Sequence, residues 1–180
     1  PSVFERDRDA IFYKTWQCVC HVSEVAEPGA YITHDIVAES VFVLRGKDGI
    51  LRGFYNVCRH RGHPLVEGCG TVTSSLVCPY HAWRYDLGGH LQRVPNATKE
   101  EIAACADIGL REVRLEEFCG FVFVNLDDDA DALEPQVADL DAVMRTYHPD
   151  PEKLRFVCET TIDHDCNWKL SIENYNECYH

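Results

Sequence analysis

Two short stretches decide the fold of this chain: Cys58-Arg59-His60 and, after seventeen further residues, Cys78-Pro79-Tyr80-His81. Each stretch holds one thiol and one imidazole, and both groups are common metal ligands. Two thiolates and two imidazoles in this order suit a [2Fe-2S] cluster in which two His replace two Cys on one iron. The spacing therefore predicts a redox centre that transfers one electron at a time.

A structural zinc site is the alternative interpretation of the same four residues. Tetrahedral zinc accepts two Cys and two His. Zinc fingers, however, pair Cys with Cys and His with His at short spacing, whereas here each stretch contains one of each. The mixed pairs favour two loops that hold a binuclear cluster between them, with both thiolates on an inner iron and both imidazoles on an outer one.

The bulk composition is that of an ordinary globular protein and excludes some partners. The 180 residues, 46% hydrophobic and 26% charged, suffice for one domain or a small domain plus part of another. The formal net charge of -13 disfavours nucleic acid, which needs a basic surface. No apolar run approaches the roughly 20 residues of a membrane span, and no secretory signal opens the chain. We therefore expect a cytoplasmic protein without a membrane partner.

Ten cysteines are present, and two of them belong to the ligand pattern. The other eight show no spacing of a disulfide framework, so we expect free thiols in a reducing compartment. These eight are Cys18, Cys20, Cys69, Cys105, Cys119, Cys158, Cys166 and Cys178.

Short strand-like runs separated by turn residues dominate the first two thirds of the chain. Many short strands with hairpin signals imply an antiparallel β-barrel or sandwich, with the two ligand loops at hairpin tips. The expected strands are 16–22, 30–36, 40–44, 51–57, 75–77, 83–86, 91–94, 113–115 and 121–125.

Helices are expected at both ends of the chain. Ser2 as N-cap and Glu5 three residues later form a capping-box pattern. An acidic run from Asp127 marks a boundary, after which the pattern predicts a helix over 135–147, a strand over 154–162 and a helix over 168–180. Because the chain starts without Met and stops inside an expected helix, we expect it to be part of a longer protein.

One face of the last expected helix is polar. On a helix, residues three and four apart are neighbours, and a polar stripe of this kind is usually the solvent side of an amphipathic helix. The residues on this face are Glu173, Asn174, Glu177 and His180.

The ligand loops, Cys-Arg-His-Arg-Gly at 58–62 and Cys-Pro-Tyr-His-Ala-Trp at 78–83, resemble those of Rieske proteins. Respiratory Rieske proteins carry an extra disulfide between the loops, but His63 and Tyr80 stand at its positions here. Ala82 replaces the Ser that often follows the second His. We therefore expect a potential toward the low end of the Rieske range of about -150 to +300 mV, as in the oxygenase branch.

From its first residues to its last, the chain resembles the large (alpha) subunit of Rieske non-haem iron oxygenases of the ring-hydroxylating type. The resemblance implies an α+β fold, with an antiparallel β Rieske domain followed by the start of a helix-grip-like catalytic domain. The implied boundaries are an N-terminal helix at 1–15, the Rieske domain at 16–126 and a truncated catalytic domain at 127–180.

The resemblance also assigns roles near the end of the chain. Asn-Trp-Lys at 167–169, then Asn174, then Glu177 three residues before His180, match the start of the oxygenase domain. Asn174 and Glu177 become candidate catalytic residues, with Glu177 bridging from a Rieske His of a neighbouring subunit. His180 becomes the first ligand of a mononuclear Fe(II) site with two His and one carboxylate, whose other ligands lie beyond this chain.

The implied system is a homotrimer that receives electrons from NAD(P)H through a reductase or ferredoxin and activates O2 against a small organic substrate. Most ring-hydroxylating dioxygenases have Asp at the bridging position. The string Glu-Cys-Tyr-His at 177–180 is similar instead to the branch that hydroxylates or demethylates quaternary ammonium compounds. The alternative functions are a stand-alone Rieske electron carrier, which the segment 154–180 disfavours, and a zinc-stabilised binding module without redox activity.

Overall fold

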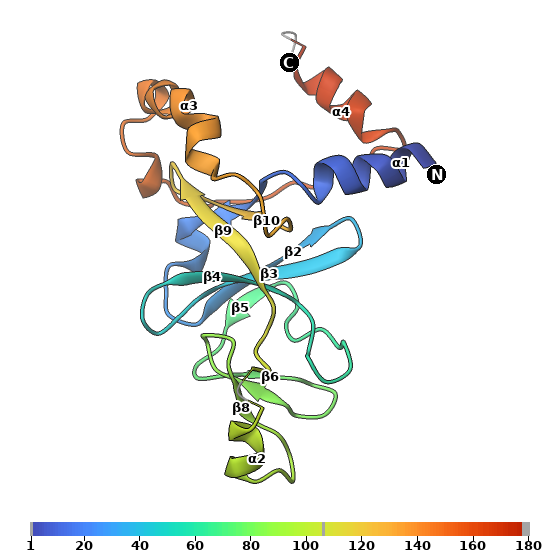
Figure 1. The fold of residues 1–180 in the computed structure, drawn as a ribbon. Coiled ribbons are helices and arrows are strands. Elements are labelled where there is room, and N and C mark those ends of the chain that lie inside the picture. The colour runs from blue at the N-terminus through green and yellow to red at the C-terminus, as the bar shows by residue number, and fades with distance from the viewer. Residues whose placement is uncertain (1, 106, 178–180) are drawn as a thin grey trace.

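The computed structural model describes residues 2–105 and 107–177. Helices lie near both ends of the chain and strands between them (Figure 1). The strands are β1 (Gln17–His21), β2 (Ala30–Ile36), β3 (Glu39–Arg45), β4 (Leu51–Tyr55), β5 (Cys69–Thr71), β6 (Leu76–Val77), β7 (Arg84–Tyr85), β8 (Leu91–Arg93), β9 (Glu112–Phe118) and β10 (Phe121–Asn125). The α-helices are α1 (Ser2–Asp7), α2 (Lys99–Ala103), α3 (Leu133–Tyr147) and α4 (Trp168–Tyr175), with a π-helix at Arg8–Phe12 and 3-10 turns at Val22–Val25 and Pro151–Lys153.

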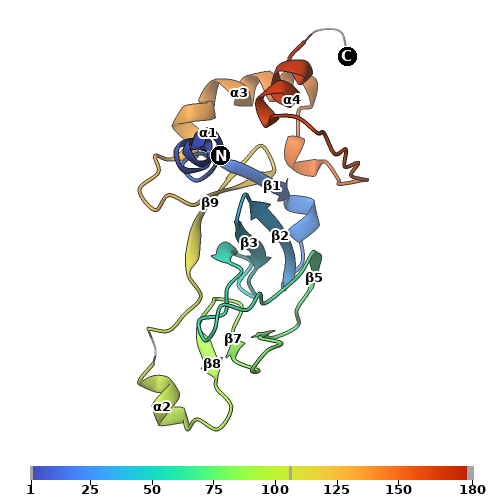
Figure 2. The ribbon, with the colours of Figure 1, turned by 90° about the vertical axis from the view of Figure 1, so that its right-hand side faces the viewer.

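The strands form two antiparallel sheets. The larger sheet has the order β1-β10-β9-β4-β3-β2-β5, and the smaller one the order β6-β7-β8. The smaller sheet and α2 lie at one end of the molecule, whereas α1, α3 and α4 gather at the other (Figure 1, Figure 2). The expected α+β architecture with antiparallel β-structure is confirmed. None of the helices within the described ranges is long and apolar enough to cross a membrane.

Strand β3 is buried on both of its faces. Val41 and Val43 pack in one apolar cluster with residues of β1, β9 and β10, whereas Phe42 and Leu44 pack in a second cluster. This alternation follows from the two-residue repeat of a strand. All four side chains are fully buried, and burial of each stabilises the fold by about 1.5–3 kcal/mol. The central strand thus joins two cores in one unit.

The second of these cores positions the ligand loops. It contains Cys58 and Cys78 together with Tyr85 of β7 and Phe54 of β4. The first ligand loop connects β4 to β5, and the second is the turn between β6 and β7. Both thiols are therefore fixed by packing, because the core that buries them also holds the two sheets together.

All nine expected strands up to residue 125 form, and two of them, 30–36 and 121–125, have the expected bounds. One strand and one α-helix were not expected. Strand β5 is a three-residue edge strand paired with β2, too short to give a periodic pattern. Helix α2 begins with a capping box in which Thr98 and Glu101 bond reciprocally, and this signal is visible in the sequence as Thr-x-x-Glu.

Three expectations near the chain ends were wrong. Residues 154–162 form no strand, because a strand needs a neighbour for its backbone hydrogen bonds and none pairs with this segment in the described part of the chain. The last helix ends at Tyr175, with Asn176 as C-cap, so Glu177 lies beyond it. Ser2 is the first residue of α1 and not its cap.

Candidate functional site

The two ligand loops are built alike. In the first, the Gly62 N–H donates to the Cys58 carbonyl at 2.9 Å, and in the second the Ala82 N–H donates to the Cys78 carbonyl, also at 2.9 Å. Gly62 and Ala82 both have left-handed backbone conformations, with φ of 72° and 54°. Glycine adopts this conformation freely, whereas an alanine does so under strain. The repeated geometry turns each loop back so that both cysteines and both histidines lie at one place.

The thiols of Cys58 and Cys78 are buried, and Cys58 lies beside the hydroxyl of Tyr85. Cys58 and Cys78 are each 2% exposed. The Tyr85 hydroxyl lies 3.3 Å from Cys58 Sγ and accepts the Arg59 N–H at 3.1 Å. Burial raises the pKa of the Cys58 thiol, and burial also raises the pKa of Tyr85. Tyr85 therefore stays protonated and can donate to a thiolate at Cys58.

The imidazoles of His60 and His81 lie nearer the surface, and the edge of one ring meets the face of the other. The ring centroids of His60 and His81 are 4.7 Å apart with planes at 72°. His60 stacks on Trp83 at 4.9 Å, and His81 contacts the Tyr80 ring at 3.8 Å. Aromatic contacts of this kind restrict ring orientation. Each imidazole is thus oriented by a neighbouring ring before any metal is bound.

The donor set fits a [2Fe-2S] cluster. His81 Nδ1 is buried and has no hydrogen-bond partner, which is unusual for a buried polar atom and is explained if it binds a metal. Burial, followed by the neighbouring His60 and Arg61 side chains, lowers the pKa of His81 and so favours the neutral ring that metals require. Among residues 2–105 and 107–177 no three His, Cys, Asp or Glu are placed to hold one ion, which is compatible with a cluster that takes two protein ligands per iron.

Asn56 is a supporting residue that the sequence analysis missed. Its side chain is buried and spans the base of the first ligand loop. Asn56 Oδ1 accepts the Leu65 and Val66 N–H groups at 2.9 and 3.2 Å, and Nδ2 donates to the Val66 carbonyl at 2.8 Å. A lone Asn after a strand gives no signal of this role, because its partners lie nine and ten residues further along the chain.

The candidate residues at the end of the chain do not join this ligand set. Glu177 is exposed, and its N–H donates to the Asn174 carbonyl at 3.2 Å. Helix α4, which precedes Glu177 and contains Asn174, lies at the end of the molecule opposite the smaller sheet (Figure 1, Figure 2). His180 lies outside the described residues.

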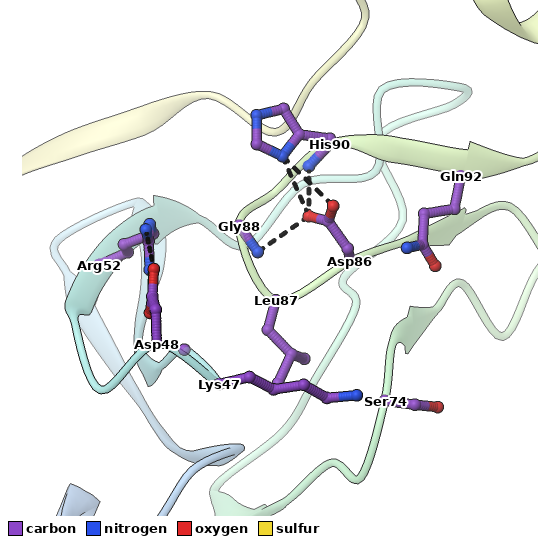
Figure 3. Close-up of a pocket in the computed structure, with 10 residues that line it drawn as sticks. Lys47, Asp48, Arg52, Ser74, Asp86, Leu87, Gly88, His90 and Gln92 are labelled. Atoms are coloured by element: carbon purple, nitrogen blue, oxygen red, sulfur yellow. Dashed lines mark hydrogen bonds and ion pairs between the residues drawn. The ribbon is translucent and has the colours of Figure 1, made fainter.

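Apart from the ligand residues, a polar pocket of about 340 Å³ lies beside the β7–β8 hairpin (Figure 3). Apart from Lys47, the charged side chains that line it are paired within the chain. Asp86 Oδ1 accepts the His90 N–H at 2.9 Å, and the Arg52 guanidinium lies 2.7 Å from Asp48. None of the four ligand residues lines this pocket, so it is separate from the candidate metal centre.

Removal of the Tyr85 hydroxyl tests how the core tunes the centre. Tyr85→Phe is expected to keep the cluster but lower its potential by tens of millivolts, because a hydrogen bond to a ligand sulfur favours the more negative reduced form. For a one-electron couple, about 59 mV corresponds to a tenfold change in equilibrium constant. A redox titration measures the shift. Tyr80→Phe is the control, since Tyr80 is 55% exposed, and equal potentials in both variants would refute the role of Tyr85.

Comparisons with known proteins agree with this geometry. A family model described as the Rieske [2Fe-2S] domain matches residues 15–115. A second, described as the ring hydroxylating alpha subunit (catalytic domain), matches residues 151–180.

Individual relatives extend along the whole chain. The carnitine monooxygenase oxygenase subunit of Escherichia coli (strain K12) is 40% identical over 179 residues, 99% of this chain and 48% of that protein. The large oxygenase component of the naphthalene 1,2-dioxygenase system of Pseudomonas aeruginosa is 33% identical over 185 residues, 99% of this chain and 41% of that protein.

One similar solved structure is that of a quaternary ammonium Rieske monooxygenase. It was described in relation to carnitine oxidation by gut microbiota and to inter-subunit electron transfer. It matches with a TM-score of 0.89 at 38% identity, over 99% of this chain and 49% of that chain. The present chain thus spans about half the length of these relatives.

Proposed function

This chain belongs to the Rieske [2Fe-2S] domain family, and from that membership we propose that it is the electron-accepting part of a Rieske oxygenase. Cys58, His60, Cys78 and His81 would hold the cluster, and the buried, unpartnered Nδ1 of His81 is the observation that carries this assignment. When bound, the cluster supplies single-electron transfer, and a mononuclear Fe(II) in the complete protein supplies O2 activation.

The four proposed ligands lie on two sides of the cluster site: the cysteines on the buried side and the histidines on the side nearer the surface. Cys58 and Cys78 bind from within the second core and exclude water from the sulfurs, since both are 2% exposed. His60 is exposed and His81 half-buried, so the imidazole side is where another protein can approach. Trp83 stacks on His60 and keeps its ring in one orientation. Electrons would therefore be exchanged on the imidazole side.

For the substrate we propose a quaternary ammonium compound that is hydroxylated or demethylated next to nitrogen. The support is the Glu-Cys-Tyr-His string at 177–180 and the higher identity to the carnitine enzyme, 40% against 33% for the naphthalene enzyme. In this proposal His180 is the first iron ligand, Asn174 and Glu177 are catalytic residues, and the other two ligands follow in the complete protein.

The proposed assembly is a cytoplasmic homotrimer supplied with electrons from NAD(P)H by a reductase or ferredoxin. In it, Glu177 of one subunit would connect the Rieske histidines of its neighbour to the mononuclear iron. The separation of α4 from the smaller sheet within one chain (Figure 1) supports transfer between subunits. So does the solved relative, which concerns inter-subunit electron transfer.

We also propose that the chain divides into an N-terminal helix at 1–15, a Rieske domain at 16–126 and the start of the catalytic domain at 127–180. The match of 151–180 to the ring hydroxylating alpha subunit favours this organisation over a stand-alone electron carrier, which would end soon after the sheets.

A turnover assay of the full-length protein tests the proposed function. With a reductase, NAD(P)H and O2, we expect substrate-dependent O2 uptake and a matching amount of oxidised product with L-carnitine or glycine betaine. Naphthalene serves as the aromatic comparison and is expected to give no product. Turnover with naphthalene alone would contradict the substrate class. Electron acceptance without any product would favour the stand-alone carrier.

A further inference from the structure

The N-terminal helical segment holds the helix that leads to Glu177. Asp7 Oδ2 accepts a hydrogen bond from Lys169 Nζ at 2.6 Å and from Trp168 Nε1 at 3.3 Å. The Phe12 ring meets the Trp168 ring edge to face, with centroids 5.1 Å apart. These contacts join residues more than 150 positions apart in the sequence, and α1 and α4 lie close together in Figure 1.

The two N-terminal contact residues border a short π-helix. Arg8–Phe12 is a π-helix, and its i→i+5 bond runs from the Tyr13 N–H to the Arg8 carbonyl at 3.0 Å. Short π segments are frequent at functional sites. Asp7 directly precedes this segment and Phe12 is its last residue, and both contact Trp168.

Burial and charge make Asp7 the centre of this contact. Its side chain is only 13% exposed, against 44% for Lys169. The hydrogen bond from Lys169 lowers the pKa of Asp7, with a smaller contribution from Trp168, so the carboxylate is charged at neutral pH. Helix α4 has no buried residue of its own. Within the described residues, the N-terminal segment supplies α4 with an ion pair, a hydrogen bond and a ring contact.

We propose that Asp7 is a positioning residue of the oxygenase, whose carboxylate fixes α4 and thereby the segment that continues to Glu177. This inference rests on the proposed function, in which Glu177 connects two redox centres. Electron transfer to the catalytic side would then depend on a residue near the start of the chain that contacts neither centre.

The test is Asp7→Asn in the full-length protein, with Asp9→Asn as the matched control. Asp9 lies in the same segment, is 60% exposed and pairs with Arg8. Loss of the charge at position 7 weakens two charge-assisted hydrogen bonds. We therefore expect amide hydrogen exchange over 167–177 to accelerate roughly tenfold or more. Exchange over 58–62 and 78–82 should stay unchanged in both variants.

Two kinetic measurements separate positioning from general damage. In Asp7→Asn, reduction of the cluster by the reductase and the cluster spectrum should match the wild type. Oxidation of the prereduced cluster by O2 and substrate should slow by roughly tenfold to a hundredfold, the range of supporting residues around metal sites. Asp7→Glu, which keeps the carboxylate, should restore most of the rate. Once Lys169→Met has removed the charged partner and left only Trp168, Asp7→Asn should have a smaller effect than it has in the wild type.

The outcomes distinguish this inference from the proposed function. Wild-type protein that shows no cluster oxidation by O2 and substrate would refute the proposed function and with it the kinetic role of Asp7. Hydrogen exchange would in that case still decide whether Asp7 holds α4. If the wild type is active and Asp7→Asn behaves like Asp9→Asn in both exchange and cluster oxidation, the positioning role is wrong.

Discussion

Glu177→Gln in the full-length protein is expected to lower turnover by at least about 100-fold, in keeping with losses at residues that support metal ligands. Glutamine keeps the shape of the side chain but loses its charge and one of its two acceptor oxygens. A carboxylate can accept N–H groups from two imidazoles, one on each side, and an amide cannot. Glu177 is exposed in this chain.

Stopped-flow oxidation of the prereduced cluster by O2 and substrate is the measurement for this variant. The cluster spectrum, the iron content and the reduction by the reductase should remain normal, because Glu177 acts after electrons have reached the cluster. Glu173→Gln is the matched control, since Glu173 is also an exposed glutamate and lies in α4. Wild-type oxidation rates in Glu177→Gln would refute the bridging role and leave Glu177 as an ordinary polar residue that follows α4.

His81→Cys is expected to produce the second large effect. Replacement of a neutral imidazole by a thiolate adds negative charge to the cluster. The potential should therefore fall from the Rieske range, at about -150 mV or above, toward the roughly -400 mV of plant-type ferredoxins, unless the cluster is lost outright. A spectroelectrochemical titration measures either result.

The same substitution at another histidine serves as control. His90 lies in the β7–β8 turn, is exposed and pairs with Asp86. His90→Cys should leave the spectrum and the potential as they are in the wild type. A normal Rieske spectrum in His81→Cys would remove His81 from the ligand set.

The ligand loops and most strands could be predicted because their signals are local. The spacing of Cys58 to His60 and of Cys78 to His81 is a property of two short loops, and strands such as β2 and β10 have apolar patterns bounded by turns. The fold places the two loops together as the spacing implies. Whether these residues bind the cluster remains a prediction that the variants above test.

Contacts between distant segments could not be predicted in this way. Tyr85 reaches Cys58 across 27 positions, and Asp7 reaches Lys169 across 162, and neither pair leaves a periodic pattern. At 154–162 the sequence pattern predicted a strand that does not form. Its apolar residues fit a strand, but no neighbouring strand pairs with it in the described part of the chain. The end of α4 at Tyr175 lacks a glycine cap signal, so the sequence pattern continued the helix too far.

The most direct test of the central claim is pulsed electron paramagnetic resonance on the reduced protein, together with iron and sulfide analysis. If Cys58, His60, Cys78 and His81 hold the cluster, the cluster should account for about two irons and two sulfides per chain, apart from the mononuclear iron of the complete protein. The reduced cluster should couple to the nitrogens of two imidazoles, and His81→Cys should leave one. Zinc without sulfide, or a cluster without nitrogen coupling, would contradict the assignment.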